Sequence, residues 1–102
     1  MFSQPIFGTL LKGLRKKGHL TQLRLVNRLA GHNYPYAVST LSMWETGHRL
    51  PSDVEVIAVL SYTMNLSELE EQALFDAYIE EFRFRAYDLY DQKREELKKR
   101  NR

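Results

Sequence analysis

Apolar residues recur at helical spacing along most of the chain, and short polar or glycine-containing segments separate the runs. The first run lies near the N-terminus, at intervals of one, three and four residues: Ile6, Phe7, Leu10, Leu11 and Leu14. This spacing places the side chains on one face of an α-helix. Two lysines precede Gly18, where positive charge suits the carboxyl end of a helix and glycine commonly follows the last turn. The pattern predicts a first helix that stops at Gly18.

The next run predicts two short helices separated by a turn. Thr21 is well suited to N-cap a second helix ending at Gly31, because its hydroxyl can accept a hydrogen bond from a free backbone N–H group. Residues 31–35 are a loop by composition, and Pro35 fits the first turn of a third helix around residues 36–45. The apolar residues of these helices lie three or four positions apart: Leu25 and Leu29, then Val38, Leu41 and Trp44.

Two capping boxes predict the starts of a fourth and a fifth helix. Ser52 is followed by Glu55, and Ser67 is followed by Glu70. In each pair the serine hydroxyl can accept from the backbone N–H three residues on, while the glutamate reaches back to the serine N–H. We expect the fourth helix to run from Asp53 to about Tyr62 and the fifth from Glu68 to about Lys99.

The fourth segment also admits a strand, because residues 54–63 are rich in β-branched side chains. Its capping box and helical spacing favour a helix, and no alternating strand pattern occurs elsewhere. The sequence therefore predicts an all-α fold of five helices. We divide it into a helix-turn-helix domain over residues 1–66 and a C-terminal helix with a basic tail over residues 67–102.

Composition narrows the chemistry. The 102 residues include no cysteine, which excludes disulfides, thiolate zinc sites and cysteine nucleophiles. The three histidines, His19, His32 and His48, lack metal-ligand spacing, and no nucleophile is framed by an acid and a base. We therefore expect no enzyme, no cofactor and no metal site. There is no signal-peptide pattern and no apolar run long enough to span a membrane, so a cytoplasmic protein is expected.

Charge is segregated along the chain although the net charge is only +2. Residues 1–51 hold seven basic residues against one acidic residue, and residues 52–92 hold ten acidic residues against two basic ones. The last ten residues are again basic. Such segregation favours a polyanion as the partner of the N-terminal half, although a scatter of solvated charges would read the same way. RNA is a weaker reading, because the sheet-borne stacking aromatics of single-strand readers are absent.

Short second and third helices, a tight turn and basic surroundings form the layout of a helix-turn-helix over about residues 21–46. Several ordered segments carry a closer resemblance: Leu14-Arg15, Leu20-Thr21-Gln22, Leu25, Ala30-Gly31, Val38-Ser39-Thr40-Leu41-Ser42-Met43-Trp44-Glu45 and Gly47-His48-Arg49-Leu50-Pro51. Together they resemble the Xre family of lambda-repressor-like helix-turn-helix regulators. The resemblance covers about residues 6–66 and implies binding to double-stranded DNA. The segment from Gly31 to Glu45 is longer than the family pattern, so residues 32–36 enlarge the turn.

The groove geometry and the resemblance together nominate a set of DNA contacts. The major groove admits one helix, whose outer face reads base edges. The nominated residues are Val38, Ser39, Ser42 and Met43 on the third helix, Asn33, Tyr34 and Tyr36 in the turn, and Gln22, His48 and Arg49 as phosphate contacts. Tyr34 has the alternative of packing the turn, and Gln22 that of a solvated helix residue. The resemblance also implies that Arg15 and Glu45 form a structural salt bridge.

The C-terminal helix carries a second pattern. Its apolar residues recur at spacings of four and three, the period of a seam between helices: Phe75, Ile79, Phe82, Ala86 and Leu89. We expect this seam to form a homodimer interface, because operator readers commonly match a two-fold site. Alternatives are that the first seam residues fold back onto the chain's own core, or that the helix binds a different protein. The basic tail is either a second DNA contact or a solvated end.

Two functions follow. The first is a sequence-specific transcriptional regulator, with repression as the expected mode. The second is an antitoxin-like or adaptor protein that binds another protein through its C-terminal helix. A small-molecule effector is not expected, because no further domain is present to hold one.

Overall fold

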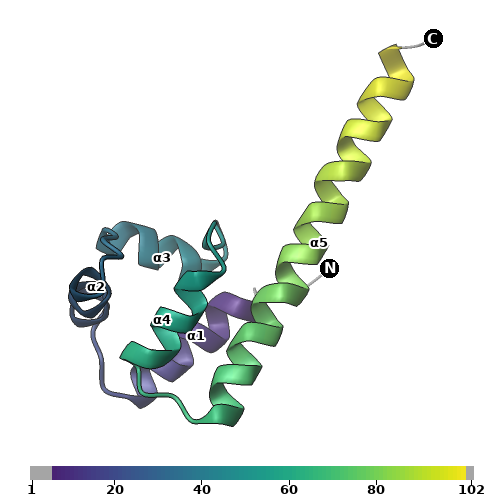
Figure 1. Cartoon of the computed structure of the whole chain (residues 1–102). Coiled ribbons are helices and arrows are strands. Elements are labelled where there is room, and N and C mark those ends of the chain that lie inside the picture. Colours follow the sequence, from purple (N-terminus) through teal and green to yellow (C-terminus); the bar gives the residue numbers. More distant parts are fainter. Residues whose placement is uncertain (1–5, 101–102) are drawn as a thin grey trace.

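The computed structural model describes residues 6–100, and within that range α-helices joined by turns and loops are the only regular secondary structure. The five helices are α1 (Ile6–Lys17), α2 (Gln22–Gly31), α3 (Val38–Thr46), α4 (Glu55–Thr63) and α5 (Glu68–Arg100) (Figure 1). The all-α, five-helix prediction is confirmed. No helix in this range is long and apolar enough to cross a membrane.

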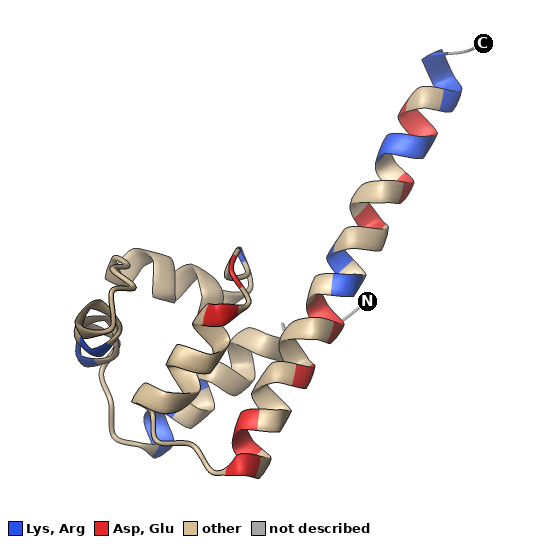
Figure 2. Cartoon of the chain, viewed as in Figure 1, with Lys and Arg blue, Asp and Glu red and all other residues tan. Residues whose placement is uncertain are grey.

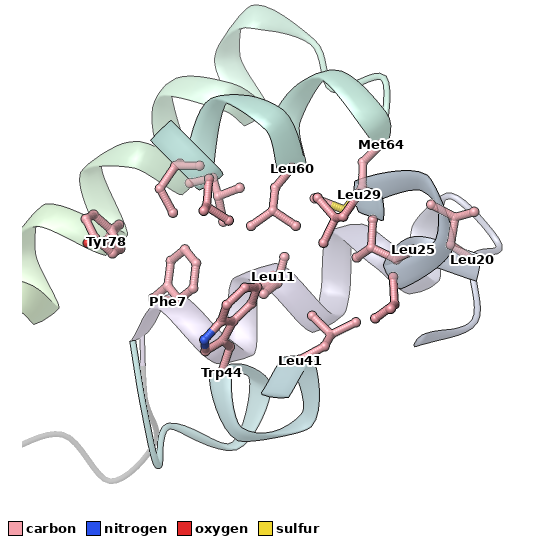
Figure 3. Close-up of a cluster of buried hydrophobic side chains, with 14 of the residues drawn as sticks. Phe7, Leu11, Leu20, Leu25, Leu29, Leu41, Trp44, Leu60, Met64 and Tyr78 are labelled. Atoms are coloured by element: carbon pink, nitrogen blue, oxygen red, sulfur yellow. The ribbon is translucent and has the colours of Figure 1, made fainter. Parts of the chain in front are cut away.

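A single core joins all five helices. Phe7 and Leu11 of α1 are fully buried and sit at its centre, between the other helices. The ring of Phe7 meets Tyr78 of α5 edge-on, with ring centroids 5.6 Å apart (Figure 3). The remaining buried apolar residues are Leu20, Leu25, Val26, Leu29, Leu41, Trp44, Val56, Ile57, Leu60, Met64, Leu74 and Ala77. α1 therefore serves as the scaffold on which α3 and α5 are mounted.

α5 has two halves with different surroundings. Its first half packs on α1 and α4 through Leu74, Ala77, Tyr78 and Glu81. Every residue from Ala86 to Arg100 is exposed. Figure 1 shows this second half projecting away from the other helices, which makes the molecule 55 Å long and only 26 by 22 Å across.

Each of the first two helices is followed, two residues after its end, by a non-glycine residue in the left-handed backbone conformation. His19 has a φ of 58° and Asn33 a φ of 66°. Each is the residue at which the chain turns, because the following N–H bonds back into the last helical turn: Leu20 to the Arg15 carbonyl, and Tyr34 to the Leu29 carbonyl. Gly18 and Gly31, the stops expected from the sequence, precede these turning residues and do not adopt positive φ.

Two helix starts differ from the expectation. α3 begins at Val38 with Ala37 as N-cap, so Pro35 lies in the loop and not in the first helical turn. α4 begins at Glu55 behind Val54, whose side chain makes no cap, and the Ser52–Glu55 capping box does not form. The other box does form: Glu70 N–H donates to the Ser67 hydroxyl over 3.2 Å and Ser67 N–H to the Glu70 carboxylate over 3.0 Å.

Candidate nucleic-acid interface

A buried ionic network fixes α3 against α1 and α2. Arg15 donates to both carboxylate oxygens of Glu45, from Nε over 2.6 Å and from Nη2 over 2.9 Å, so the expected ion pair is present. Gln22 Nε2 donates to the same carboxylate over 3.0 Å, and Arg15 Nη1 donates to the Leu20 carbonyl over 2.8 Å. The side chains of Arg15 and Glu45 are only 8% and 2% exposed. A two-point pair of this kind fixes orientation as well as distance.

A close backbone contact adds a second constraint on α3. The helix is closed by Gly47, whose φ of 84° suits glycine. Just before it, the last turn of α3 lies against Gly8 of α1, so closely that an added Cβ would stand 2.3 Å from the Trp44 carbonyl oxygen. Only glycine at position 8 allows this approach. Trp44 and Leu41 cover the inner face of α3, which leaves its opposite face outward.

The outward face of α3 carries only uncharged side chains. Val38 is 36% exposed, Ser39 is exposed, and Ser42 and Met43 are half-buried. The one charged residue of the helix, Glu45, is buried. The four predicted base-reading residues therefore occur on one short helix, and the two outermost are Val38 and Ser39.

The enlarged turn is packed as well as exposed. The ring of Tyr36 stacks edge-on against Trp44, with centroids 4.8 Å apart, and burial raises the pKa of Tyr36 above its ordinary 10.0. Tyr34 is half-buried against the core. Asn33 is exposed, but its backbone is the left-handed turn of α2. Both tyrosine rings thus hold the turn in place, which was the alternative role considered for Tyr34.

The three expected phosphate contacts have different surroundings. Gln22 is half-buried and uses an amide N–H on Glu45. His48 is exposed and its Nδ1 lies 2.8 Å from the Thr46 hydroxyl. Arg49 is exposed, and no ion pair to it occurs within residues 6–100.

The basic charge of the N-terminal half is partly used inside the molecule. Arg15 is buried, Arg28 donates to the Thr63 carbonyl over 2.8 Å, and Lys17 pairs with Glu70 at 2.8 Å. Among the described residues, five exposed bases from this half enter no ion pair: Lys12, Lys16, Arg24, Arg28 and Arg49. The charge available to a polyanion is therefore smaller than the composition suggests. Figure 2 shows the acidic residues concentrated at the start of α5.

Three residues that anchor α5 were not singled out by the sequence. Tyr78 donates its hydroxyl to the Pro51 carbonyl over 2.7 Å. Glu81, only 4% exposed, accepts from the Phe7 N–H at the start of α1 over 3.2 Å. Arg85 donates to the Gly47 carbonyl that closes α3 and lies 3.4 Å from Glu81. Their spacing in the sequence could have indicated this role, because these residues share a helix face with the buried Leu74 and Ala77.

The expected dimer seam is the neighbouring face of α5. Phe75 is 39% exposed, Phe82 50% and Leu89 66%, Ala86 is exposed, and only Ile79 packs partly on the core. The seam is thus available to a partner over most of its length.

No protein-family model, curated protein or solved structure matches the chain. No group of three or more histidine, aspartate or glutamate side chains suited to a metal ion occurs in the part of the chain that the structure describes.

Proposed function

We propose that this chain is a sequence-specific regulator of transcription, acting as a repressor, that binds duplex DNA with α3 in the major groove. The observation that carries the proposal is the mounting of α3. Its inner side is fixed by Glu45 to two other helices and by Gly8 to the α1 backbone, while its outer side carries only small, uncharged groups. A rigidly held helix with such a face suits a groove about 12 Å wide. The resemblance to lambda-repressor-like regulators supports the same assignment.

The outward residues divide into two kinds of contact. Ser39 and Ser42 carry hydroxyls that hydrogen-bond to base edges, and Val38 and Met43 offer apolar contact to thymine methyl groups. Arg49 supplies charge to the phosphates, and the free N–H groups at the start of α2 favour an anion beside Gln22. No arginine, asparagine or glutamine on α3 offers a two-point contact to a base, so discrimination should be moderate.

The test begins with duplexes selected from random sequence by the full-length chain, followed by fluorescence anisotropy. Log affinity should fall linearly with log salt, at a slope of about −0.9 for each phosphate neutralised. Arg49→Ala should weaken all duplexes alike and reduce the slope by about one, whereas Ser39→Ala should weaken the selected duplex more than a scrambled one. Arg83→Ala is the control for Arg49→Ala and Thr9→Ala is the control for Ser39→Ala. Each removes the same kind of group at a position away from α3, so neither should change the affinity for DNA. Affinity that does not change between ~50 and ~200 mM salt would contradict DNA binding.

A second function, that of an antitoxin-like or adaptor protein, is favoured by the exposed aromatic surface of α5. Phe82, Tyr87 and Tyr90 are 50%, 65% and 65% exposed on a segment that projects from the domain. Large exposed apolar surface commonly marks a protein interface. A chain that selects no DNA sequence would move this function ahead of the first.

A further inference from the structure

α5 carries an apolar stripe beside the face that it buries in its own domain. We define the α5 stripe as Phe75, Ile79, Phe82, Ala86 and Leu89, which follow one another at spacings of four and three. This is the period at which two helices pair along a seam. A hollow of about 550 Å³ surrounds Ala86 between the rings of Phe82 and Tyr90, so the small side chain of Ala86 leaves room for a large one.

The two ends of α5 carry opposite charge. Residues 68–81 contain six acidic residues and no basic one, and residues 93–100 contain five basic residues against two acidic ones. Figure 2 shows the separation, with acidic residues along the first half of α5, which packs on the domain, and basic residues at its far end. A second α5 running antiparallel therefore meets opposite charge at both ends. A parallel one meets like charge at both ends, which is unfavourable.

A groove lies where the basic end of such a partner would arrive. It has a volume of about 440 Å³ and runs between α4 and the start of α5. Its apolar surface comes from Val54, Ile57, Ala58 and Phe75, and Glu68 and Glu71 line its acidic side. Neither glutamate enters an ion pair within residues 6–100. The basic end of α5 carries an exposed leucine, Leu97, among its charged residues. Such an amphipathic helix end fits a groove that is apolar on one side and acidic on the other.

We propose that two copies of this chain pair through α5 in an antiparallel arrangement, with the basic end of each α5 seated in the groove between α4 and α5 of the other. In this register Phe82 lies opposite the partner's Ala86, and Ile79 opposite the partner's Leu89. Glu68 then lies opposite the partner's Arg100, and Glu71 lies opposite the partner's Leu97, within one turn of that arginine. The same register overlaps the two helices along their whole length, so the ring of Phe82 meets the small Ala86 and the acidic ends meet the basic ends. This pairing does not require the chain to bind DNA.

Sedimentation of the full chain at about 50 µM gives the first measurement, and we expect a dimer. A monomer at that concentration overturns the proposal. Direction is read from cross-links, which is straightforward because the chain has no cysteine. Gln72→Cys and Glu96→Cys, both at exposed positions, are treated with a short bismaleimide. The antiparallel register links the two variants when they are mixed and leaves each alone unlinked. Efficient linking of each variant to itself indicates parallel pairing and overturns the proposal.

Charge reversal tests the groove. E68K/E71K and, separately, K99E/R100E should each weaken dimerisation at least tenfold, and the four changes together should restore it. E80K/D88K applies the same charge change at exposed positions on the side of α5 away from the stripe and should leave the dimer within about twofold of wild type. If the four-change variant is no tighter than either double variant, the groove is not the seat of the partner's helix end. Circular dichroism on each variant separates loss of pairing from loss of fold.

Discussion

At the scale of single residues, the buried carboxylate of Glu45 is the group through which three helices are joined. It accepts two hydrogen bonds from Arg15 and one from Gln22 while only 2% of its side chain is exposed. No buried side-chain nitrogen or oxygen in residues 6–100 lacks a partner. A buried charge that is fully paired is tolerated, but removing its partner leaves it stranded in a low-dielectric surrounding.

We therefore predict that Arg15→Ala destabilises the domain by roughly 3 kcal/mol, because it strands the Glu45 charge. Urea denaturation followed by circular dichroism measures the change in the free energy of unfolding. Arg24→Ala removes an arginine that is exposed on α2 and should change stability by less than about 0.5 kcal/mol. Unchanged stability of the Arg15 variant, together with lost DNA affinity, would instead make Arg15 a DNA contact.

Glu70 should make stability sensitive to acid. Its hydrogen bonds from Lys17 and from the Ser67 N–H lower the pKa of Glu70 from its ordinary 4.5 to about 2. A carboxylate with a depressed pKa stabilises the fold fully above 4.5, and this contribution is lost as the pH falls from 4.5 toward 2. Because the pair is exposed, solvent and salt screen it and the effect should be small.

The measurement is the thermal midpoint of wild type and Glu70→Gln from pH 7 down to pH 2 in low salt. Wild type should be the more stable near neutrality, and the difference should shrink as the pH falls below about 4.5. Glu80→Gln, at an exposed position of α5 outside the groove, is the matched control and should follow wild type. A constant difference between wild type and Glu70→Gln across the range would show that the ion pair is not responsible.

At the scale of elements, two glycines of α1 should respond in opposite directions to the same substitution. A Cβ at Gly8 would stand 2.3 Å and 2.6 Å from the carbonyl oxygens of Trp44 and Glu45, whereas a Cβ at Gly13 meets nothing within 4 Å. Gly8→Ala should thus cost on the order of 3 kcal/mol by forcing α1 and α3 apart. Gly13→Ala should add about 0.5–1 kcal/mol, because alanine loses less backbone entropy in a helix. Equal effects in denaturant unfolding would rule out this close approach.

The sequence predicted the helices themselves well, because each has a repeating apolar face that must be buried. Helix ends were predicted less well, since they depend on single residues. Gly18 and Gly31 were expected to end the first two helices, yet His19 and Asn33 adopt the left-handed conformation. The direction of the next helix determines which residue makes the turn, and the local sequence does not show that direction. Ser67 and Glu70 form their capping box. The same pattern at Ser52 does not form, because α4 starts at Glu55, two residues after the expected Asp53, with Val54 at the N-cap position.

The candidate site shows the same division. The Arg15–Glu45 pair followed from the family resemblance, since a pattern of aligned residues carries contacts between distant positions. The roles of Tyr78, Glu81 and Arg85 were not predictable in this way, because their partners are backbone groups of Pro51, Phe7 and Gly47. Such contacts arise only once the helices are packed. On α5, two adjacent faces have helical periodicity, and the sequence pattern alone did not indicate which one the domain buries.

At the scale of the whole molecule, dimer formation and DNA binding should be coupled through mass action. Replacing both Phe82 and Leu89 by alanine should leave the monomer nearly as stable as wild type, because these side chains are 50% and 66% exposed. The double variant should sediment as a monomer. Its affinity for DNA with two half-sites should fall far more than its affinity for one half-site, because the second contact is no longer tethered.

Anisotropy with the two kinds of duplex measures the difference. Leu69→Ala removes an apolar side chain of α5 that is 85% exposed and lies outside the stripe, its hollow and the groove, so it should have no such effect. A wild-type chain that binds one half-site and two half-sites with equal affinity per site would separate the DNA-binding proposal from the dimer proposal.

The anchoring of α5 also makes it a lever with its fulcrum at Glu81. Two turns of α5 hold it to the rest of the domain by three hydrogen bonds, which involve Tyr78, Glu81 and Arg85. Every described residue after Arg85 is exposed. With a rise of about 1.5 Å per residue, a tilt of about 10° at Glu81 displaces Arg100 by roughly 5 Å, more than one base-pair step of about 3.4 Å. In a paired molecule the same tilt changes the distance between the two α3 helices. The stiffness of these three hydrogen bonds would then determine which spacings between DNA half-sites the dimer accepts. Base pairs between the half-sites, which no side chain contacts, would thus affect affinity through their number.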